Sequence, residues 1–174
     1  EVPLVAGINQ AISLDQARAF LSEHGAVMLK ALAGGGGRGM RPVFAVSELD
    51  EAFARCQSEA RAAFGNDALY IEQLVSHARH IEIQVLGDVT GAVSHLWERD
   101  CSLQRRQQKL VEIAPSPDLP AATRERMIVA ALTLARAARY QGLGTFEFLL
   151  DAEQPERFYF MEANPRIQVE HTVT

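Results

Sequence analysis

Two glutamates near the end of the sequence are spaced so that they could share one metal ion. Glu147 lies in the alternating segment GTFEFLL and Glu162 lies in RFYFMEAN, with the turn-forming loop DAEQPE between the two segments. We expect an antiparallel hairpin in which Asp151 is opposite Phe158, a register that sets Glu147 directly against Glu162. Like charges opposed across strands destabilise a sheet unless a cation lies between them. Glu147, Glu162 and Asn164 would then offer hard oxygen ligands to Mg²⁺ or Mn²⁺, whereas a register shifted by one residue would leave two solvated glutamates.

A second group of polar residues follows at once in the segment NPRIQVEH. If this segment is extended, one side carries Arg166, Gln168 and Glu170, while Ile167 and Val169 anchor the opposite side. Arginine offers a bidentate fork for a planar oxyanion, and a neighbouring carboxylate is able to take a proton from that anion. The alternative is a surface pair of arginine and glutamate that contributes at most about 1 kcal/mol.

A run of glycines follows one of the two lysines in the sequence. Lys30 precedes ALAGGGGRGM, and the other lysine is Lys109, in a chain of 17 lysines and arginines together. The glycines satisfy the dinucleotide pattern GxGxxG, but a strand rather than a helix follows them, and the residues that complete a P-loop are missing. A glycine-rich loop between two strands is able to fold over phosphates and donate backbone N–H groups to them. The alternative is a flexible linker.

The elements that would position this loop form a unit of helices and strands. A capping box that starts at Ser13 predicts a helix over residues 13–24. The segments AVMLKAL and RPVFAV read as strands on either side of the glycines, and Pro42 indicates that the second strand lies at a sheet edge. Ser47 is expected to cap a further helix, which ends at Gly65.

The rest of the sequence predicts strands in LYIEQL, HIEIQVLGD and GAVSHLWERD, a long helix over 119–140 and the closing hairpin. One face of HIEIQVLGD is apolar through Ile81, Ile83 and Val85. The other face carries mainly polar residues, namely His80, Glu82, Gln84 and Leu86. We expect this second face to meet solvent by default, or else a ligand.

Composition excludes several classes of function. The formal net charge is −5, with no long run of like charges, which argues against nucleic acid or an anionic membrane as the main partner. The longest apolar run, MIVAALTLA, is too short to cross a bilayer. Cys56 and Cys101 stand in no metal-ligand spacing and predict reduced thiols, which is typical of a cytoplasmic protein.

Five motifs together resemble biotin carboxylase of the ATP-grasp superfamily. They are KALAGGGGRGMR, RHIEIQVLGD, ERDCSLQRRQQK, GTFEFL and MEANPRIQVEHTVT, and they occur in the family's order over nearly all 174 residues. The resemblance implies an α+β ATP-grasp fold, with a lid subdomain over 1–72 that carries the glycine-rich loop and part of the antiparallel-sheet core over 73–174. The family's whole domain is longer, so we expect this chain to be an excerpt that is inactive by itself.

The resemblance also assigns roles to residues. It implies that Glu147, Glu162 and Asn164 bind the metal, and that Arg166, Glu170 and Lys109 are catalytic, with Glu170 as the base that deprotonates bicarbonate. The implied positions for ATP and the other small substrates are Lys30, Gly34, Gly35, Gly36, Gly37, Gly39, Met40, Glu72, Val75, His80, Gln104, Leu149, Gln168 and Val169.

The chemistry implied by the resemblance is ATP-dependent carboxylation of biotin by bicarbonate through carboxyphosphate. The implied partners are a biotinylated carrier domain and a carboxyltransferase domain or subunit, and the full-length protein is expected to be a homo-oligomer. Two alternatives stay open: another ATP-grasp ligase such as the carbamoyl phosphate synthetase large chain, and a catalytically silent nucleotide-binding module. The final carboxyl acceptor does not follow from this sequence.

Overall fold

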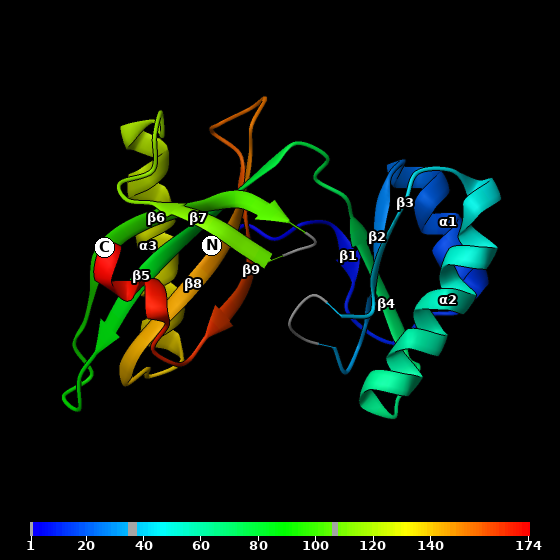
Figure 1. Ribbon diagram of the computed structural model, residues 1–174, viewed down its shortest axis with the longest axis horizontal. Coiled ribbons are helices and arrows are strands. Elements are labelled where there is room, and N and C mark those ends of the chain that lie inside the picture. Colours follow the sequence, from blue (N-terminus) through cyan, green and yellow to red (C-terminus); the bar gives the residue numbers. More distant parts are fainter. Residues whose placement is uncertain (1, 35–37, 106–107) are drawn as a thin grey trace. The chain divides into compact units, whose positions relative to one another are not determined.

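The computed structural model describes residues 2–34, 38–105 and 108–174, and the chain forms two compact units (Figure 1). One unit is Val5–Ser76. The other joins the segment that ends at Leu4 to His77–Thr174. None of the helices among the described residues is long and apolar enough to cross a membrane.

The Val5–Ser76 unit is a four-stranded antiparallel sheet with two helices packed on it (Figure 1). The strands follow the order β1, β4, β2, β3 across the sheet. Its core is apolar side chains that alternate along the central strands and face the two helices, because successive strand residues point to opposite faces. The elements are β1 (Gly7–Ile8), α1 (Leu14–His24), β2 (Val27–Ala31), β3 (Met40–Val43), α2 (Val46–Phe64) and β4 (Leu69–Gln73).

The two helices begin in different ways. The capping box predicted for α1 is confirmed, since Ser13 Oγ accepts from Gln16 N–H and the Gln16 side chain accepts from Ser13 N–H. The cap predicted at Ser47 is wrong, because α2 already begins at Val46 and its N-cap, Ala45, makes no side-chain bond. Glu48 in the first turn instead accepts from the N–H of Phe44, at 3.3 Å. This carboxylate ties the residue before the N-cap to the first turn, and its charge is favourable near the helix N-terminus.

The glycine loop joins β2 to β3, and β3 is an edge strand, as Pro42 indicated. Gly39 closes the loop by accepting from Ala31 N–H at 2.7 Å. Its φ is +66°, and a Cβ there would lie 2.8 Å from Ala31 Cβ. Glycine is required at this position for both reasons. Gly35, Gly36 and Gly37, which were assigned to phosphate binding, lie outside the described residues.

The other unit is a five-stranded antiparallel sheet in the order β7, β6, β5, β8, β9, with α3 packed on one face (Figure 1). Ile81, Ile83 and Val85 are buried against α3, which confirms the predicted apolar face of this strand. The sequence predicted the helix and most strands but missed β7. The elements are β5 (Ala78–Gly87), β6 (Val93–Arg105), β7 (Gln108–Ile113), α3 (Ala121–Ala137), β8 (Gly142–Asp151), β9 (Phe158–Asn164) and the 3₁₀ helix η1 (Val169–Val173).

The closing hairpin has a register that changes along its length. Phe158 is opposite Leu150, so the expected pairing with Asp151 is wrong by one residue near the turn. An irregularity between Glu147 and Phe148 then shifts the register, and Glu147 stands opposite Glu162. The predicted opposition of the two acids is therefore confirmed, although a β-bulge brings it about.

Candidate functional site

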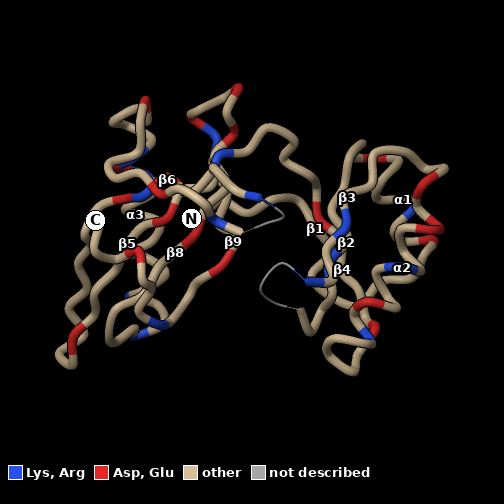
Figure 2. Tube along the Cα trace, in the orientation of Figure 1, with Lys and Arg blue, Asp and Glu red and all other residues tan. Residues whose placement is uncertain are grey.

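The site is built on the face of the β5–β8 sheet that lies opposite α3. Glu82 and Gln84 on β5 and Glu147 on β8 are 0%, 0% and 3% exposed. The expectation that this face meets solvent is wrong for these residues, because Arg99 on β6 and Lys109 on β7 contact their polar groups. Figure 2 shows that acidic and basic residues both occur along the strands of this sheet. Buried carboxylates are retained when cations and hydrogen bonds compensate them.

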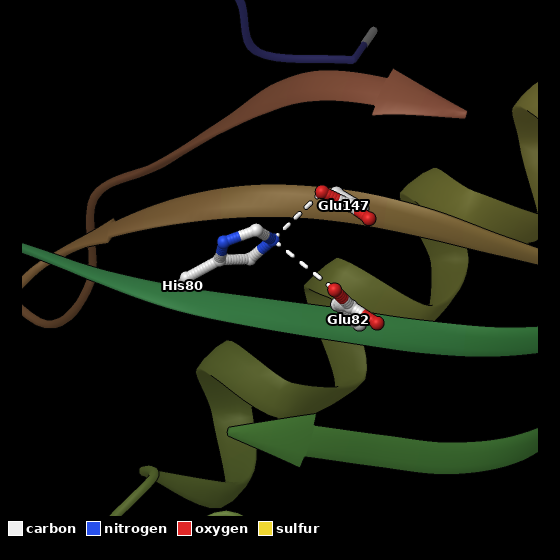
Figure 3. Close-up of side chains that lie close together, drawn as sticks. All are labelled: His80, Glu82 and Glu147. Atoms are coloured by element: carbon white, nitrogen blue, oxygen red, sulfur yellow. Dashed lines mark ion pairs between the residues drawn. The ribbon is translucent and has the colours of Figure 1, made fainter. Parts of the chain in front are cut away.

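Three possible metal donors converge on this face (Figure 3). His80 Nε2 lies 2.8 Å from Glu147 Oε2 and 3.3 Å from Glu82 Oε1. Glu82 and Glu147 are direct partners in the antiparallel register, which explains why one imidazole reaches both. Lys109 Nζ contacts Glu82 Oε1 and lies 3.2 Å from Glu147 Oε1.

His80 and Lys109 lower the pKa of the Glu147 carboxyl. Burial raises the pKa of the Glu147 carboxyl, but the hydrogen bond and charge of His80, together with Lys109, lower that pKa more, so it lies below its ordinary value. A carboxylate that binds a metal must be ionised. The electrostatics of the site therefore fit the proposed ligand role.

The three residues that the sequence analysis assigned to the metal lie close together in the hairpin of β8 and β9. Asn164 Nδ2 lies 2.7 Å from Glu147 Oε1 and 3.4 Å from Glu162 Oε1. Glu162 is exposed, whereas Glu147 is buried, so one carboxylate of the pair is accessible to solvent and the other is not. Two carboxylates and the amide oxygen of Asn164 are ligand types that suit a hard divalent cation such as Mg²⁺ or Mn²⁺, whereas in this structure the Asn164 amide nitrogen donates to both carboxylates. His80 and Glu82 are neighbours that the sequence did not assign to the metal.

Other predicted residues surround this group. Gln104 Nε2 lies 3.0 Å from His80 Nδ1 and donates to Cys101 O at 2.8 Å. Gln104 is paired with Lys109 across β6 and β7, and Leu149 is paired with His80 across β5 and β8. The missed strand β7 is thus the element that places Lys109.

The segment after β9 differs from the expected extended strand. Val169–Val173 forms a 3₁₀ helix, and Ile167 and Val169 are 55% and 88% exposed, so they do not anchor it. Gln168 is buried instead, and its Oε1 accepts from Arg99 Nη2 and Thr145 Oγ1, each at 2.9 Å. A polar anchor has replaced the apolar one because the underlying face carries Arg99.

The two residues expected to handle the oxyanion lie on either side of this anchor. Arg166 is exposed, and its Nη1 lies 3.3 Å from Ile167 O. Glu170 is half-buried, and its charge, after the larger effect of burial, raises the pKa of Glu112. The two side chains are placed by the same short segment, one exposed and the other half-buried.

The Val5–Ser76 unit brings together two further predicted residues. Lys30 and Glu72, on the neighbouring strands β2 and β4, form an ion pair with side chains 12% and 14% exposed. Lys30 Nζ also lies 5.9 Å from the centre of the Tyr70 ring. Met40 is opposite Lys30 on β3, Gly34 and Gly39 flank the glycine loop, and Val75 is half-buried beyond β4.

Comparison with known proteins shows the family to which this chain belongs. Residues 1–174 match the family described as the carbamoyl-phosphate synthase L chain, ATP binding domain. The chain is 50% identical to pyruvate carboxylase from Aspergillus niger over 176 residues, which cover 100% of this chain and 15% of that protein. It is 54% identical to pyruvate carboxylase 1 from Caenorhabditis elegans over 161 residues, or 92% of this chain and 14% of that protein.

Solved structures of biotin carboxylases are also similar to this chain. A biotin carboxylase complex with an ATP analogue from Campylobacter jejuni superposes with a TM-score of 0.93 at 47% identity, covering 99% of this chain and 39% of that one. The biotin carboxylase domain of Hydrogenobacter thermophilus 2-oxoglutarate carboxylase, solved with MgADP, ADP and bicarbonate, gives a TM-score of 0.91 at 44% identity, covering 98% and 38%.

The fold is thus the α+β ATP-grasp fold, and the solved structures that it matches include biotin carboxylases. The chain belongs to the family of the carbamoyl-phosphate synthase L chain ATP-binding domain, and the resemblance to biotin carboxylase is confirmed. It spans about 15% of the length of the pyruvate carboxylases that it matches.

Proposed function

We propose that this chain is the ATP-binding part of a biotin carboxylase, which carboxylates biotin with bicarbonate through carboxyphosphate. The observation that carries the proposal is the opposed pair Glu147 and Glu162, joined by Asn164 and set beside Lys109 and His80. Phosphoryl transfer depends chiefly on positioning and on charge stabilisation, and this cluster supplies both acidic and basic groups in fixed places.

The Val5–Ser76 unit is assigned to the nucleotide. Lys30 would contact the phosphates of ATP, and Glu72 would accept from the adenine amino group, with Met40 and Val75 beside it. The residues from Gly34 to Gly39 would serve as a lid over the phosphates. Because Lys30 and Glu72 are paired to each other here, nucleotide binding must redistribute this ion pair.

The other unit is assigned to the metal and bicarbonate. Glu147, Glu162 and Asn164 would hold Mg²⁺ or Mn²⁺, which supplies charge neutralisation on the phosphates when bound. Arg166 would hold bicarbonate through its guanidinium fork, and Glu170 would remove the bicarbonate proton. The half-buried position of Glu170 and the exposed position of Arg166 support these roles.

The remaining components follow from the relatives. The matched proteins include pyruvate carboxylases and a 2-oxoglutarate carboxylase, so the proposed partners are a biotinylated carrier domain and a carboxyltransferase, with assembly of the complete protein as a homo-oligomer. The second candidate is another bicarbonate-activating ATP-grasp ligase, which the description of the matching family favours. Identities near 50% to pyruvate carboxylases favour the biotin-dependent reaction.

The test is ATP cleavage by the complete gene product with bicarbonate and free biotin, beside nucleotide titration of this chain. Both substrates should stimulate cleavage, and Glu170→Gln should lower kcat by about 100-fold or more, since the loss of a general base costs at least that much. Glu156→Gln, at an exposed position in the hairpin loop, is the control and should be unchanged. Stimulation by bicarbonate alone supports the second candidate, and normal cleavage by Glu170→Gln overturns the base assignment.

A further inference from the structure

Arg99 on β6 is the largest of the fully buried side chains and is 0% exposed. A guanidinium carries five N–H donors, and each has an acceptor here, so none is left for a substrate. The contacts are Glu112 Oε2 at 3.2 Å from Nε, Gln84 Oε1 at 2.9 Å and Thr174 Oγ1 at 2.6 Å from Nη1, and Glu82 Oε2 at 3.1 Å and Gln168 Oε1 at 2.9 Å from Nη2.

One side of this guanidinium holds the segment that carries the proposed base. Gln168 immediately precedes η1, and its Oε1 is held by Arg99 and by Thr145 on β8. Thr174, just beyond η1, is bonded to the same guanidinium. Arg99 therefore binds the segment on both sides of Glu170, at Gln168 and at Thr174. Ile167 is exposed and adds no apolar contact that would hold the segment.

The other side of Arg99 holds Glu82, which contacts Lys109 and His80. Nη2 bonds Glu82 Oε2, while Glu82 Oε1 contacts Lys109 and lies 3.3 Å from His80 Nε2. Glu82 is fully buried, so its orientation depends on these partners. Arg99 thus contacts both Glu82, which binds Lys109, and Gln168, which anchors the segment that carries Glu170.

We infer that Arg99 is a positioning residue that sets the distance between the oxyanion-handling segment 166–170 and the Glu82–Lys109 pair. It acts through Gln168 and Glu82, and it has no contact with substrate. The inference rests on the proposed function for its kinetic consequence, but its structural consequence is independent of any activity.

The structural test is amide hydrogen exchange in the complete gene product. Arg99→Lys keeps the charge but replaces the planar fork by three donors on one atom. Exchange over residues 167–173 should accelerate at least about tenfold, while β2 and β4 of the other unit exchange as in the unchanged protein. Thr145→Val removes the second bond on Gln168 Oε1 and the long 3.5 Å bond from Arg99 Nη2 to Thr145 Oγ1, but it keeps the Arg99–Gln168 bond, so it should accelerate the same segment to a smaller degree.

The kinetic test separates positioning from general stability. Arg99→Lys should raise the KM for bicarbonate by about tenfold or more, because small displacements of binding groups carry large kinetic costs. The dissociation constant of the nucleotide should change less than about threefold, because Lys30 and Glu72 are in the other unit. A merely structural role would lower the amount of active protein and leave the KM unchanged.

Arg79→Lys is the matched control. Arg79 is a part-buried arginine on β5 that pairs with Asp100 Oδ2 at 2.6 Å and also bonds Ser116 Oγ and Pro117 O. It carries the same chemical change in the same sheet and contacts neither Gln168 nor Glu82 among the described bonds. Its expected result is lower thermal stability with an unchanged KM for bicarbonate.

Each outcome decides a separate point. Unchanged exchange over 167–173 in Arg99→Lys overturns the positioning role whether or not the protein is active. If that variant does not fold, unchanged exchange in Gln168→Met, which removes the acceptor of the Arg99 bond, overturns it instead. Accelerated exchange with an unchanged KM overturns the link to bicarbonate. Absence of bicarbonate-dependent ATP cleavage in the unchanged protein overturns the proposed function and leaves the exchange result to decide the role of Arg99.

Discussion

Glu82 on β5 and Glu147 on β8 stand directly opposite each other, and the ammonium of Lys109 contacts both carboxylates. The two acids are 0% and 3% exposed, so water screens their repulsion poorly. Like charges in this position destabilise a sheet unless a cation compensates them. The sheet therefore depends on a lysine that comes from β7, which is separated from β8 by β6 and β5.

Removal of this lysine should destabilise the fold itself. Lys109→Met leaves the two buried carboxylates with His80, Arg99 and Asn164 as their remaining described partners, and we expect it to lower the free energy of unfolding by about 2 kcal/mol. The figure lies below the usual range for buried pairs because the Lys109 side chain is 22% exposed.

Urea unfolding at pH 7 measures this change. The control is Arg105→Met, which removes an exposed cation from the neighbouring strand β6 and should shift the free energy by less than about 0.5 kcal/mol. Equal effects of the two variants would show that Lys109 does not compensate the buried acids.

The sequence predicted the two acids on opposite strands but not the group around them. Alternation gave the apolar face of β5 correctly, because periodicity depends only on local residue type. The burial of Glu82 was missed, since burial of a charge depends on Arg99 and Lys109, which arrive from other strands. The register of β5 and β8 places Glu82 against Glu147, but that register is set by tertiary pairing between strands far apart in the sequence.

The segment 166–170 shows a second limit of prediction from the sequence. If the segment were extended, its alternation would bury Ile167 and Val169, yet the structure buries Gln168 and begins η1 at Val169. A hydrophobic pattern predicts which side chains are buried from their polarity alone. Here the buried surface that the segment contacts contains the Arg99 guanidinium, which donates to the side-chain oxygen of Gln168, so a polar side chain is buried. Polar anchoring of this kind leaves no periodic signal in a single sequence.

Asp100 should give the other unit a measurable pH dependence. Burial raises the pKa of Asp100, but bonds from Ser102 and Arg79 lower it more, so the folded pKa is below 3.8. A lowered pKa means that the stabilising contribution is present above the ordinary value and is lost as the pH falls through the folded value. Asp100→Asn should therefore cost about 2 kcal/mol at pH 7 and progressively less below pH 3.8.

Urea unfolding at several pH values compares the two proteins. Glu125→Gln, an exposed acid on α3, provides the control and should show a difference within about 0.5 kcal/mol at every pH. A cost for Asp100→Asn that persists unchanged in acid would assign the effect to packing rather than to the charge.

Gly39→Ala tests the close approach that shapes the glycine loop. The φ of Gly39 is +66°, and an added Cβ would lie 2.8 Å from Ala31 Cβ, so we expect a loss of at least about 2 kcal/mol in the free energy of unfolding. Gly65 has a φ of +71°, but a Cβ added there would meet no atom within 4 Å, and Gly65→Ala should cost only about 1 kcal/mol. Equal losses for the two variants would mean that the Ala31 contact relaxes without cost.

Glu162 offers the sharpest test of the metal assignment, which rests on the proposed function. Its side chain is exposed, so Glu162→Gln should leave the free energy of unfolding within about 0.5 kcal/mol of the unchanged protein. If Glu162 is a ligand together with Glu147, the same variant should weaken Mn²⁺ binding about tenfold or more, because a neutral amide oxygen replaces a charged donor.

Paramagnetic titration of the complete gene product with Mn²⁺ and nucleotide measures this affinity. Glu156→Gln keeps the same chemical change on the loop of the same hairpin and should bind Mn²⁺ normally. Glu147→Gln should also weaken Mn²⁺ binding, but it should lower stability as well, because His80 and Lys109 lose a buried anionic partner. Normal Mn²⁺ affinity in Glu162→Gln would show that Glu162 is a solvated surface acid and not a ligand. The possible metal ligands would then be His80, Glu82 and Glu147.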